Sequence, residues 1–200
     1  MRSHPGALTL FLVRHGLTQA NADGLLLGRA DRPLTDVGRM QASEIAATIG
    51  RPGLVVSSPL ARARETAAAF GLEVEVEVDE RWIEIDYGEY DCLPLRDVPA
   101  EFWAAWRGDP SVRPPGGESL VDLGVRVREA CEDLAPRARD QDVVVVTHVS
   151  PIKAAVAWAL SVGDEVAWRT FVAVASITRV AVTERGPSLH SFNETHHLVG

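Results

Sequence analysis

The chain has 200 residues, of which 46% are hydrophobic and 24% are charged, and its formal net charge is −8. This length is typical of one α/β domain with a single core, so we predict one domain over residues 1–200. The acidic balance excludes the broad basic surface that binding to nucleic acid or to an anionic membrane would require. Any affinity for phosphate must therefore come from a few local cations.

The sequence gives no signal for a leader, a membrane span, a metal or a cofactor. Leu8–Val13 is apolar but too short for a signal sequence or a membrane span. Cys92 and Cys131 have neither metal-ligand nor disulfide spacing, which favours free thiols in a reducing cytosol. His196 and His197 are adjacent in an expected tail and point opposite ways if it is extended. We therefore predict a cytoplasmic protein with no metal and no cofactor.

Strands alternate with helices in the first half of the chain, as in a mostly parallel sheet covered on both faces. Leu8–Val13 predicts the first strand, and a helix over 36–49 follows, with Thr35 as its N-cap. Leu54–Ser57 predicts the second strand. Ser58 and Pro59 are then expected to begin a helix that ends near Phe70.

The second half continues this alternation after one long irregular stretch. Glu and Val alternate over Glu73–Val78, which predicts a strand with one wet and one buried face. Residues 79–117 contain a short predicted helix, Val98–Trp106, and form a candidate lid or specificity segment. Trp103 and Trp106 on it are interpreted as helix core, with a lid role as the alternative. The remaining predicted elements are a helix over 118–135, strand Val143–Thr147, helix Pro151–Leu160, and a hairpin of Ser176–Thr183 with Ser188–Asn193.

Polar clusters follow three of the predicted strands. Arg14 and His15 follow the first strand, Ser58 follows the second, and His148 ends the strand near residue 147, while Arg62 lies one turn into the helix after the second strand. The carboxyl ends of parallel strands meet at one edge of a sheet, so these residues should converge. Guanidinium groups match phosphate oxygens, and neutral imidazole can attack phosphorus. The cluster therefore predicts a phosphate-binding pocket with a histidine nucleophile.

Several motifs in a fixed order extend this pattern. They are Leu12–Thr18 with Asn21, Ser57–Leu60 with Arg62, Glu84 with Tyr87–Tyr90, Pro115–Ser119, and Thr147-His148. Together, over residues 8–160, they resemble the histidine phosphatase superfamily, also called phosphoglycerate-mutase-like, and within it the small phosphatases such as the alpha-ribazole and broad-specificity phosphatases. The resemblance implies a three-layer α/β/α fold with a mostly parallel central sheet.

The resemblance also implies a role for each matching residue. His15 would be the nucleophile that forms a phosphohistidine, and Arg14, Arg62 and His148 would hold the phosphoryl oxygens. Glu84 would give a proton to the leaving alcohol and later activate water, with Asp86 and Glu89 as competing candidates. Further substrate contacts are expected from Asn21, Gly16, Thr18 and the backbone of Val149.

This chain departs from the family pattern at two places. Val149-Ser150-Pro151 replaces the usual Gly-Gly after the second histidine, and Lys153 stands where Arg is common. Ser150 and Pro151 are nevertheless expected to start a helix. In addition, Asp91-Cys92 replaces the usual small Gly after the acid-bearing segment.

These patterns favour a metal-independent phosphatase, of the histidine acid phosphatase type, that hydrolyses a small phosphorylated metabolite. A phosphoglycerate-type phosphomutase is the first alternative, and a non-catalytic phosphate-binding regulator is the second. The terminal hairpin could also pair sheet edges in a homodimer. The physiological substrate is left open by the sequence.

Overall fold

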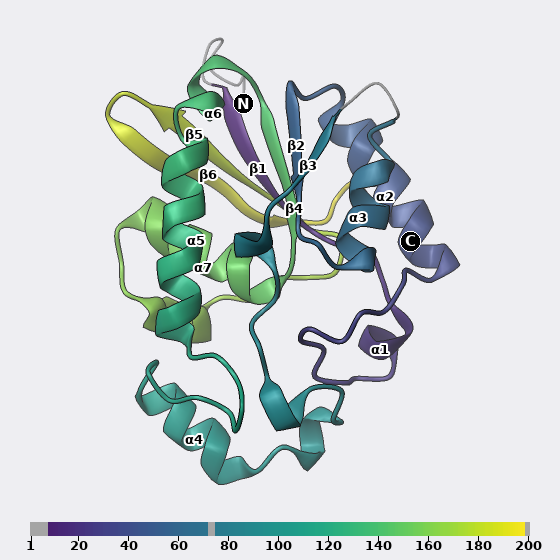
Figure 1. Ribbon diagram of the computed structural model, residues 1–200. Coiled ribbons are helices and arrows are strands. Elements are labelled where there is room, and N and C mark those ends of the chain that lie inside the picture. The colour runs from purple at the N-terminus through teal and green to yellow at the C-terminus, as the bar shows by residue number, and fades with distance from the viewer. Residues whose placement is uncertain (1–7, 72–74, 199–200) are drawn as a thin grey trace.

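The computed structural model describes residues 8–71 and 75–198, which form a six-stranded sheet with helices on both faces (Figure 1). The strand order is β3-β2-β4-β1-β5-β6. The first four strands in this order are parallel, and β5 and β6 run antiparallel to their neighbours. The strands are β1 Thr9–Arg14, β2 Leu54–Ser57, β3 Val76–Val78, β4 Val143–Thr147, β5 Ile177–Thr183 and β6 Gly186–Glu194. The predicted fold class is confirmed.

The helices form a layer on each side of this sheet, as Figure 1 shows. One layer contains α2 and α3, and the other contains α5 and α7. The short helix α4 lies below both layers in this view, within the segment 79–117. The helices are α1 Gln19–Ala22, α2 Asp36–Ile49, α3 Ala61–Ala68, α4 Ala100–Gly108, α5 Leu120–Leu134, α6 Arg137–Asp140 and α7 Val149–Leu160. Short 3₁₀ turns occupy 80–82, 88–90, 95–97 and 164–169.

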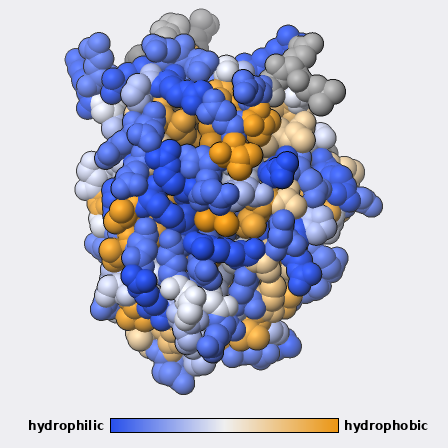
Figure 2. All heavy atoms as spheres, viewed as in Figure 1, coloured by the Kyte–Doolittle hydropathy of each residue, from blue (hydrophilic) through white to orange (hydrophobic). Residues whose placement is uncertain are grey.

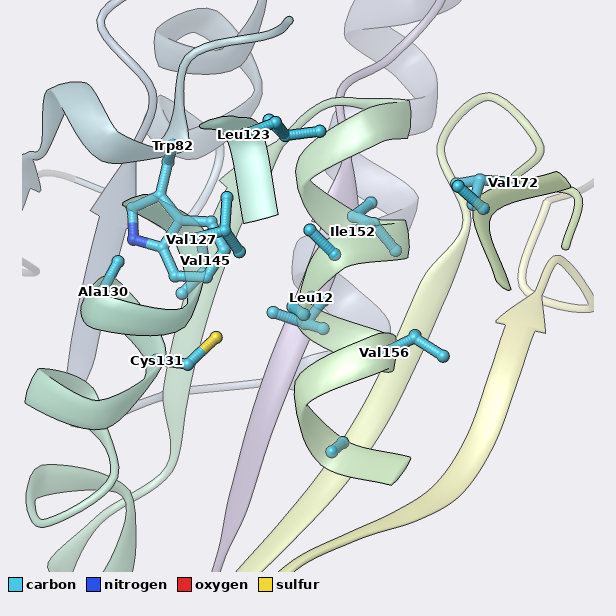
Figure 3. Close-up of a cluster of buried hydrophobic side chains, with 14 of the residues drawn as sticks. Leu12, Trp82, Leu123, Val127, Ala130, Cys131, Val145, Ile152, Val156 and Val172 are labelled. Atoms are coloured by element: carbon cyan, nitrogen blue, oxygen red, sulfur yellow. The ribbon is translucent and has the colours of Figure 1, made fainter. Parts of the chain in front are cut away.

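The central strands are apolar throughout because both of their faces are covered. In β1, Leu12 packs into the cluster beneath α5 and α7, whereas Val13 packs into the cluster beneath α2 and α3. In β4, Val145 and Val146 divide in the same way. Figure 3 shows Leu12 and Val145 together with Ile152 and Val156 of α7 in the first cluster. This two-sided packing fixes the register of β1 against β4, in which Leu12 is opposite Val145.

Two helices begin at different residues from those predicted. Ser58 was expected to cap α3, but α3 begins at Ala61 and has no side-chain cap, because the Ser58 hydroxyl contacts His148 instead. α7 begins at Val149 rather than Pro151. Pro151 is the third residue of this helix, where a missing N–H removes no intrahelical hydrogen bond. The short helix α1, capped by Thr18, was not predicted.

The predicted alternation over Glu73–Val78 is wrong for the residues that the structure describes, and Glu73 and Val74 lie outside them. β3 is an edge strand of three residues, Val78 is 51% exposed, and Glu77 is half-buried. Both Nη atoms of Arg137 pair with the Glu77 carboxylate, at 2.8 and 2.7 Å. An edge strand packs on few neighbours. The ion pair with Arg137 therefore partly covers Glu77, and the alternation of Glu and Val does not decide which side chains of β3 are buried.

The surface on the side of Figure 2 is mostly hydrophilic, with hydrophobic residues in small separate groups. Within 8–71 and 75–198, no helix combines the length and apolar character needed to cross a bilayer. Strands β3 and β6 form the two edges of the sheet. Pairing of the terminal hairpin in a homodimer stays a prediction.

The loop after β1 is pressed against the start of α2 through two glycines. A Cβ atom added to Gly16 would collide with the carbonyl oxygen of Gly38, and one added to Gly38 would collide with the carbonyl oxygen of Leu17. Thr35 caps α2 and also donates its hydroxyl to the Leu17 carbonyl, at 3.1 Å. Gly16 therefore allows a close backbone contact, which fixes the residues next to His15.

We expect Gly38→Ala to lower the free energy of unfolding by about 1–3 kcal/mol, because backbone atoms must move to admit the methyl group. Gly108→Ala is the matched control, since Gly108 is also helical and has open space around its Cβ position. That control should be neutral or slightly stabilising. Urea denaturation of the two variants measures the difference, and equal stabilities would contradict the contact.

Candidate active site

His15, His148 and Arg62 meet at the carboxyl edge of the parallel strands. The two imidazole rings lie edge to face, with centroids 5.1 Å apart. The Nε atom of Arg62 is 3.2 Å from His15 Nε2 and 3.2 Å from His148 Nδ1. All three side chains are buried, and Arg62 and His148 are fully so. The predicted convergence of residues from three separate strand ends is therefore present.

The hydrogen bonds of each imidazole define which ring nitrogen carries the proton. Arg62 can only donate, so His15 Nε2 and His148 Nδ1 both face it as acceptors. His15 Nδ1 donates to the carbonyl oxygen of Gly16 at 2.7 Å, and His148 Nε2 donates to the Ser58 hydroxyl at 2.7 Å. The arrangement leaves a lone pair on Nε2 of His15, which is the electron pair that a nucleophile needs.

The surroundings keep both imidazoles neutral. Burial lowers the pKa of His15 well below that of an exposed histidine, the charges of Arg62 and Arg14 act in the same direction, and the bond to Gly16 opposes them. The pKa of His148 is also lowered well below its usual value, first by burial and then by the charge of Arg62. At neutral pH His15 is therefore uncharged.

Arg62 is held by a loop that is itself clamped by Asp91. Its Nη1 donates to the carbonyl oxygen of Ala30 at 2.9 Å, and its Nη2 donates to that of Gly28 at 2.6 Å. The Asp91 carboxylate accepts from the backbone N–H groups of the same two residues, at 2.7 Å from Gly28 and 2.8 Å from Ala30. The neighbouring Cys92 has a φ of 65°, a conformation that glycine adopts more readily, which accounts for the usual Gly near this position. In the sequence, Asp91 is only a departure from the family pattern. Its role in holding the loop at Gly28 and Ala30 depends on a contact between distant parts of the chain.

Arg14 offers a donor to an anion. Its Nη1 donates to the carbonyl oxygen of Val172 at 2.9 Å, while its Nε is buried and has no partner among the residues that the structure describes. Burial lowers the pKa of the Arg14 guanidinium to about 10, and the charge of Glu84 opposes this effect. Arg14 is therefore still a cation at neutral pH, with an N–H group available for a phosphoryl oxygen.

Glu84 is the buried carboxyl group next to this cluster. It accepts hydrogen bonds from the backbone N–H groups of Val149 (3.1 Å), Ser150 (3.2 Å) and Ile85 (2.8 Å). Asp86 instead pairs with Arg29 at 3.3 Å, and Glu89 is exposed. Among the three carboxyl groups considered, Glu84 is the buried one, and its charge acts on Arg14 and Arg62. The Val149 N–H, expected to face phosphate, is bonded to Glu84 because this carboxylate occupies the amino end of α7.

Arg126 holds the segment that carries Glu84. It donates to the carbonyl oxygens of Arg81 at 2.6 Å and Ile83 at 2.8 Å, and it pairs with Glu118 at 2.8 Å. Sequence reasoning missed Arg126, because a helix arginine is normally a solvated charge. The only sequence feature that indicates a role for Arg126 is its ion-pair partner Glu118, which lies in the Pro115–Ser119 motif.

The residues expected to contact substrate from the β1 loop have mainly structural partners. Thr18 is fully buried and caps α1, where its hydroxyl donates to Asn21 Oδ1 at 2.9 Å, so the expectation that Thr18 binds substrate is wrong. The Gly16 N–H donates to the Thr66 hydroxyl at 3.1 Å, so Gly16 positions His15 rather than a ligand. The Asn21 carboxamide oxygen is engaged by Thr18, which leaves its amide nitrogen as the atom that can donate to phosphate.

Outside residues 1–7, 72–74 and 199–200, no group of three or more His, Cys, Asp or Glu side chains lies in an arrangement that could hold a metal ion.

Comparison with known proteins establishes the family. The model for the histidine phosphatase superfamily (branch 1) matches residues 10–195. The chain therefore belongs to the histidine phosphatase superfamily, as its motifs predicted. Phosphoserine phosphatase 1 of Hydrogenobacter thermophilus is 32% identical over 197 residues, which cover 94% of this chain and 93% of that protein. The family and the fold thus agree with the site geometry.

Other relatives agree with this assignment. A bifunctional protein of Mycobacterium tuberculosis is 35% identical over 198 residues, and the match covers 94% of this chain but only 54% of that relative's length. A phosphoserine phosphatase of Entamoeba histolytica, solved with phosphoserine, superposes with a TM-score of 0.88 at 27% identity, covering 96% of this chain and 99% of the other. The alpha-ribazole phosphatase of Shigella flexneri gives a TM-score of 0.82 at 26% identity, covering 96% and 98%.

The two neutral histidines should make the fold sensitive to mild acid. Below the ordinary histidine pKa of about 6.5 the unfolded chain takes up protons that buried His15 and His148 do not, so unfolding becomes easier as pH falls. We expect a loss of up to about 1.4 kcal/mol per pH unit for each histidine between pH 6.5 and 5. Carboxylates with a lowered pKa, such as Glu77 beside Arg137, act at lower pH. Urea denaturation of the wild type and of His15→Asn/His148→Asn between pH 7 and 5 measures this, and equal slopes would refute it.

Replacement of Asp91 tests the clamp on Arg62. In Asp91→Asn one carboxylate oxygen becomes an amide nitrogen, so only one of the two backbone N–H groups keeps its acceptor. We expect the affinity for inorganic phosphate to fall about tenfold, the loss typical of removing a group that orients a ligand-binding residue. The control is Asp97→Asn, an exposed carboxylate on the same segment. Titration calorimetry that shows the same affinity for both variants would exclude this role.

Proposed function

We propose that this chain hydrolyses phosphomonoesters of small metabolites through a phosphohistidine on His15. The observation that carries the proposal is the Nε2 lone pair of His15, which faces the same Arg62 Nε as His148 while Nδ1 is fixed on Gly16. The family membership and the phosphatase names of relatives support it. The bifunctional mycobacterial relative is nearly twice as long, so its second activity is not carried over.

In the first step the His15 Nε2 lone pair attacks phosphorus, and the bond between phosphorus and the alcohol oxygen breaks. The electron pair of that bond stays on the alcohol oxygen, which takes a proton from the acid form of Glu84. The guanidinium groups of Arg14 and Arg62 stabilise the charge that develops on the phosphoryl oxygens, and the neutral His148 lies beside them. The alcohol leaves, and a phosphoryl group stays on Nε2.

In the second step water replaces the alcohol. The Glu84 carboxylate takes a proton from the water molecule as its oxygen bonds to phosphorus, and the bond between phosphorus and Nε2 breaks. The electron pair returns to His15, phosphate leaves, and Glu84 is again an acid. Glu84 therefore donates a proton in the first step and accepts one in the second.

The proposal includes metal independence. The guanidinium groups of Arg14 and Arg62 supply the positive charge and hydrogen-bond donors for the phosphoryl oxygens, and proton transfer is assigned to Glu84. Activity toward p-nitrophenyl phosphate should therefore persist in excess EDTA. Loss of activity in EDTA that returns with added divalent metal would refute this part.

Replacements of His15 and Glu84 should have different consequences. His15→Ala should reduce turnover by about 10⁴-fold or more, because the nucleophile is absent. Glu84→Gln should slow release of the alcohol from alkyl phosphates by about 10²–10⁴-fold, but affect the first release of nitrophenolate from p-nitrophenyl phosphate far less, because nitrophenolate leaves without a proton. Rapid-quench measurement of alcohol release in the first turnover compares the two substrates, because the second step needs Glu84 for both. Glu89→Gln, an exposed carboxyl on the same segment, is the control and should behave as the wild type.

Mass spectrometry after a quench without acid should detect labile phosphate on His15 during turnover. Phosphate binding without an adduct or a product would favour a regulatory protein instead. Interconversion of phosphoglycerates that requires a bisphosphate would favour a mutase.

A further inference from the structure

A cavity of about 180 Å³ opens beside the candidate active site. Three tryptophans line it: Trp103 and Trp106 from α4, and Trp168 from the turn after α7. The indole rings of Trp103 and Trp106 stack at 5.7 Å, and Trp168 lies nearly perpendicular to Trp106 at 5.2 Å. Lys153 of α7 contributes the one charged side chain among the lining residues. We call this cavity the tryptophan pocket.

The tryptophan pocket lies where the leaving alcohol of the proposed reaction would extend. Its lining includes Val149 and Ser150, whose backbone N–H groups hold the Glu84 carboxylate. The charge of Glu84 also acts on Lys153. In the proposed reaction Glu84 gives its proton to the alcohol oxygen, so the alcohol must extend on the Glu84 side of the phosphoryl group. The tryptophan pocket is the cavity on that side.

The ammonium group of Lys153 is the charged donor of the pocket. Lys153 Nζ donates to the Ala167 carbonyl at 2.8 Å, and an ammonium group has three N–H bonds. No Asp or Glu lines the pocket within the described chain. Unpaired donors in an aromatic cavity favour a ligand that brings an anionic oxygen, and disfavour an ammonium group.

The volume restricts the size of this ligand. At about 30 Å³ for each water-sized group, 180 Å³ holds about six such groups. A short carbon chain with a carboxylate fits this space.

We propose that the tryptophan pocket binds the alcohol part of the substrate and selects small phosphomonoesters whose alcohol carries a carboxylate. Lys153 pairs with the carboxylate, and the aromatic walls of the pocket exclude water, which strengthens this ion pair. This inference rests on the proposed function, because it takes the reaction and the direction of the alcohol from it. It assigns a specificity role to residues that the motifs did not include.

A matched pair of substrates tests the inference. 3-Phosphoglycerate and glycerol 3-phosphate share a three-carbon skeleton but differ in one carboxylate, and the measured quantity is the ratio of their kcat/KM values. We expect a ratio of about 10 or more in the wild type, because a hydrogen bond to a charged group is worth at least a factor of ten. Lys153→Met should bring the ratio close to 1, and Lys153→Arg should restore most of it. Trp168→Phe, which makes one aromatic wall of the pocket smaller, should lower the ratio less than Lys153→Met.

The control removes a cation from the segment 79–117, which carries Trp103 and Trp106. Arg96 is 85% exposed and does not line the pocket, so Arg96→Met should keep the wild-type ratio. A wild-type ratio near 1, or a ratio unchanged in both Lys153→Met and Trp168→Phe, would overturn the pocket assignment. Hydrolysis of p-nitrophenyl phosphate with a phosphohistidine on His15 would show that the proposed function survives that result. If the wild type hydrolyses none of the three esters, the proposed function fails and the pocket assignment fails with it.

Discussion

The site depends on one N–H group that is shared between two neutral imidazoles. Arg62 Nε lies 3.2 Å from His15 and 3.2 Å from His148, so a single guanidinium orients both rings and keeps a proton off the nitrogens that face it. Burying this cation is unfavourable unless its other donors are satisfied. The carbonyl oxygens of Gly28 and Ala30 satisfy them, and Asp91 fixes the loop that carries these carbonyls. Much of the chain between β1 and α4 therefore serves to hold one side chain.

A second set of contacts places the carboxyl group. The amino end of α7 binds Glu84 through two backbone N–H groups, and Arg126 holds the backbone before it. Because α7 follows directly from His148, the first residues of this helix hold the proposed acid, Glu84, next to the His148 imidazole. The same end of α7 borders the tryptophan pocket, so proton transfer and selection of the alcohol are tied to one helix. The Val149-Ser150 departure from Gly-Gly is compatible with this arrangement, since backbone N–H groups make the contacts.

The sequence predicted the fold class, the four central elements β1, β2, α2 and β4 within one residue, and the convergence of His15, His148, Arg14 and Arg62. These predictions succeeded because buried parallel strands are read directly from apolar runs, and because their carboxyl ends must share an edge. Thr18 and Ser58 were misjudged for a common reason. Each hydroxyl group has several potential partners, and the sequence does not show which one lies close in space.

The sequence by itself determined which residues end the strands, and therefore the identity of the pocket-forming histidines and arginines. Only the tertiary structure decided their hydrogen-bond partners: the Gly16 carbonyl on His15, the Asp91 clamp, and the Arg126 support of Glu84. It also brought Trp168 against the tryptophans of α4, about 60 residues away in the chain. Periodicity along a chain fixes which face of an element is buried, but contacts between distant elements depend on distances that packing alone sets.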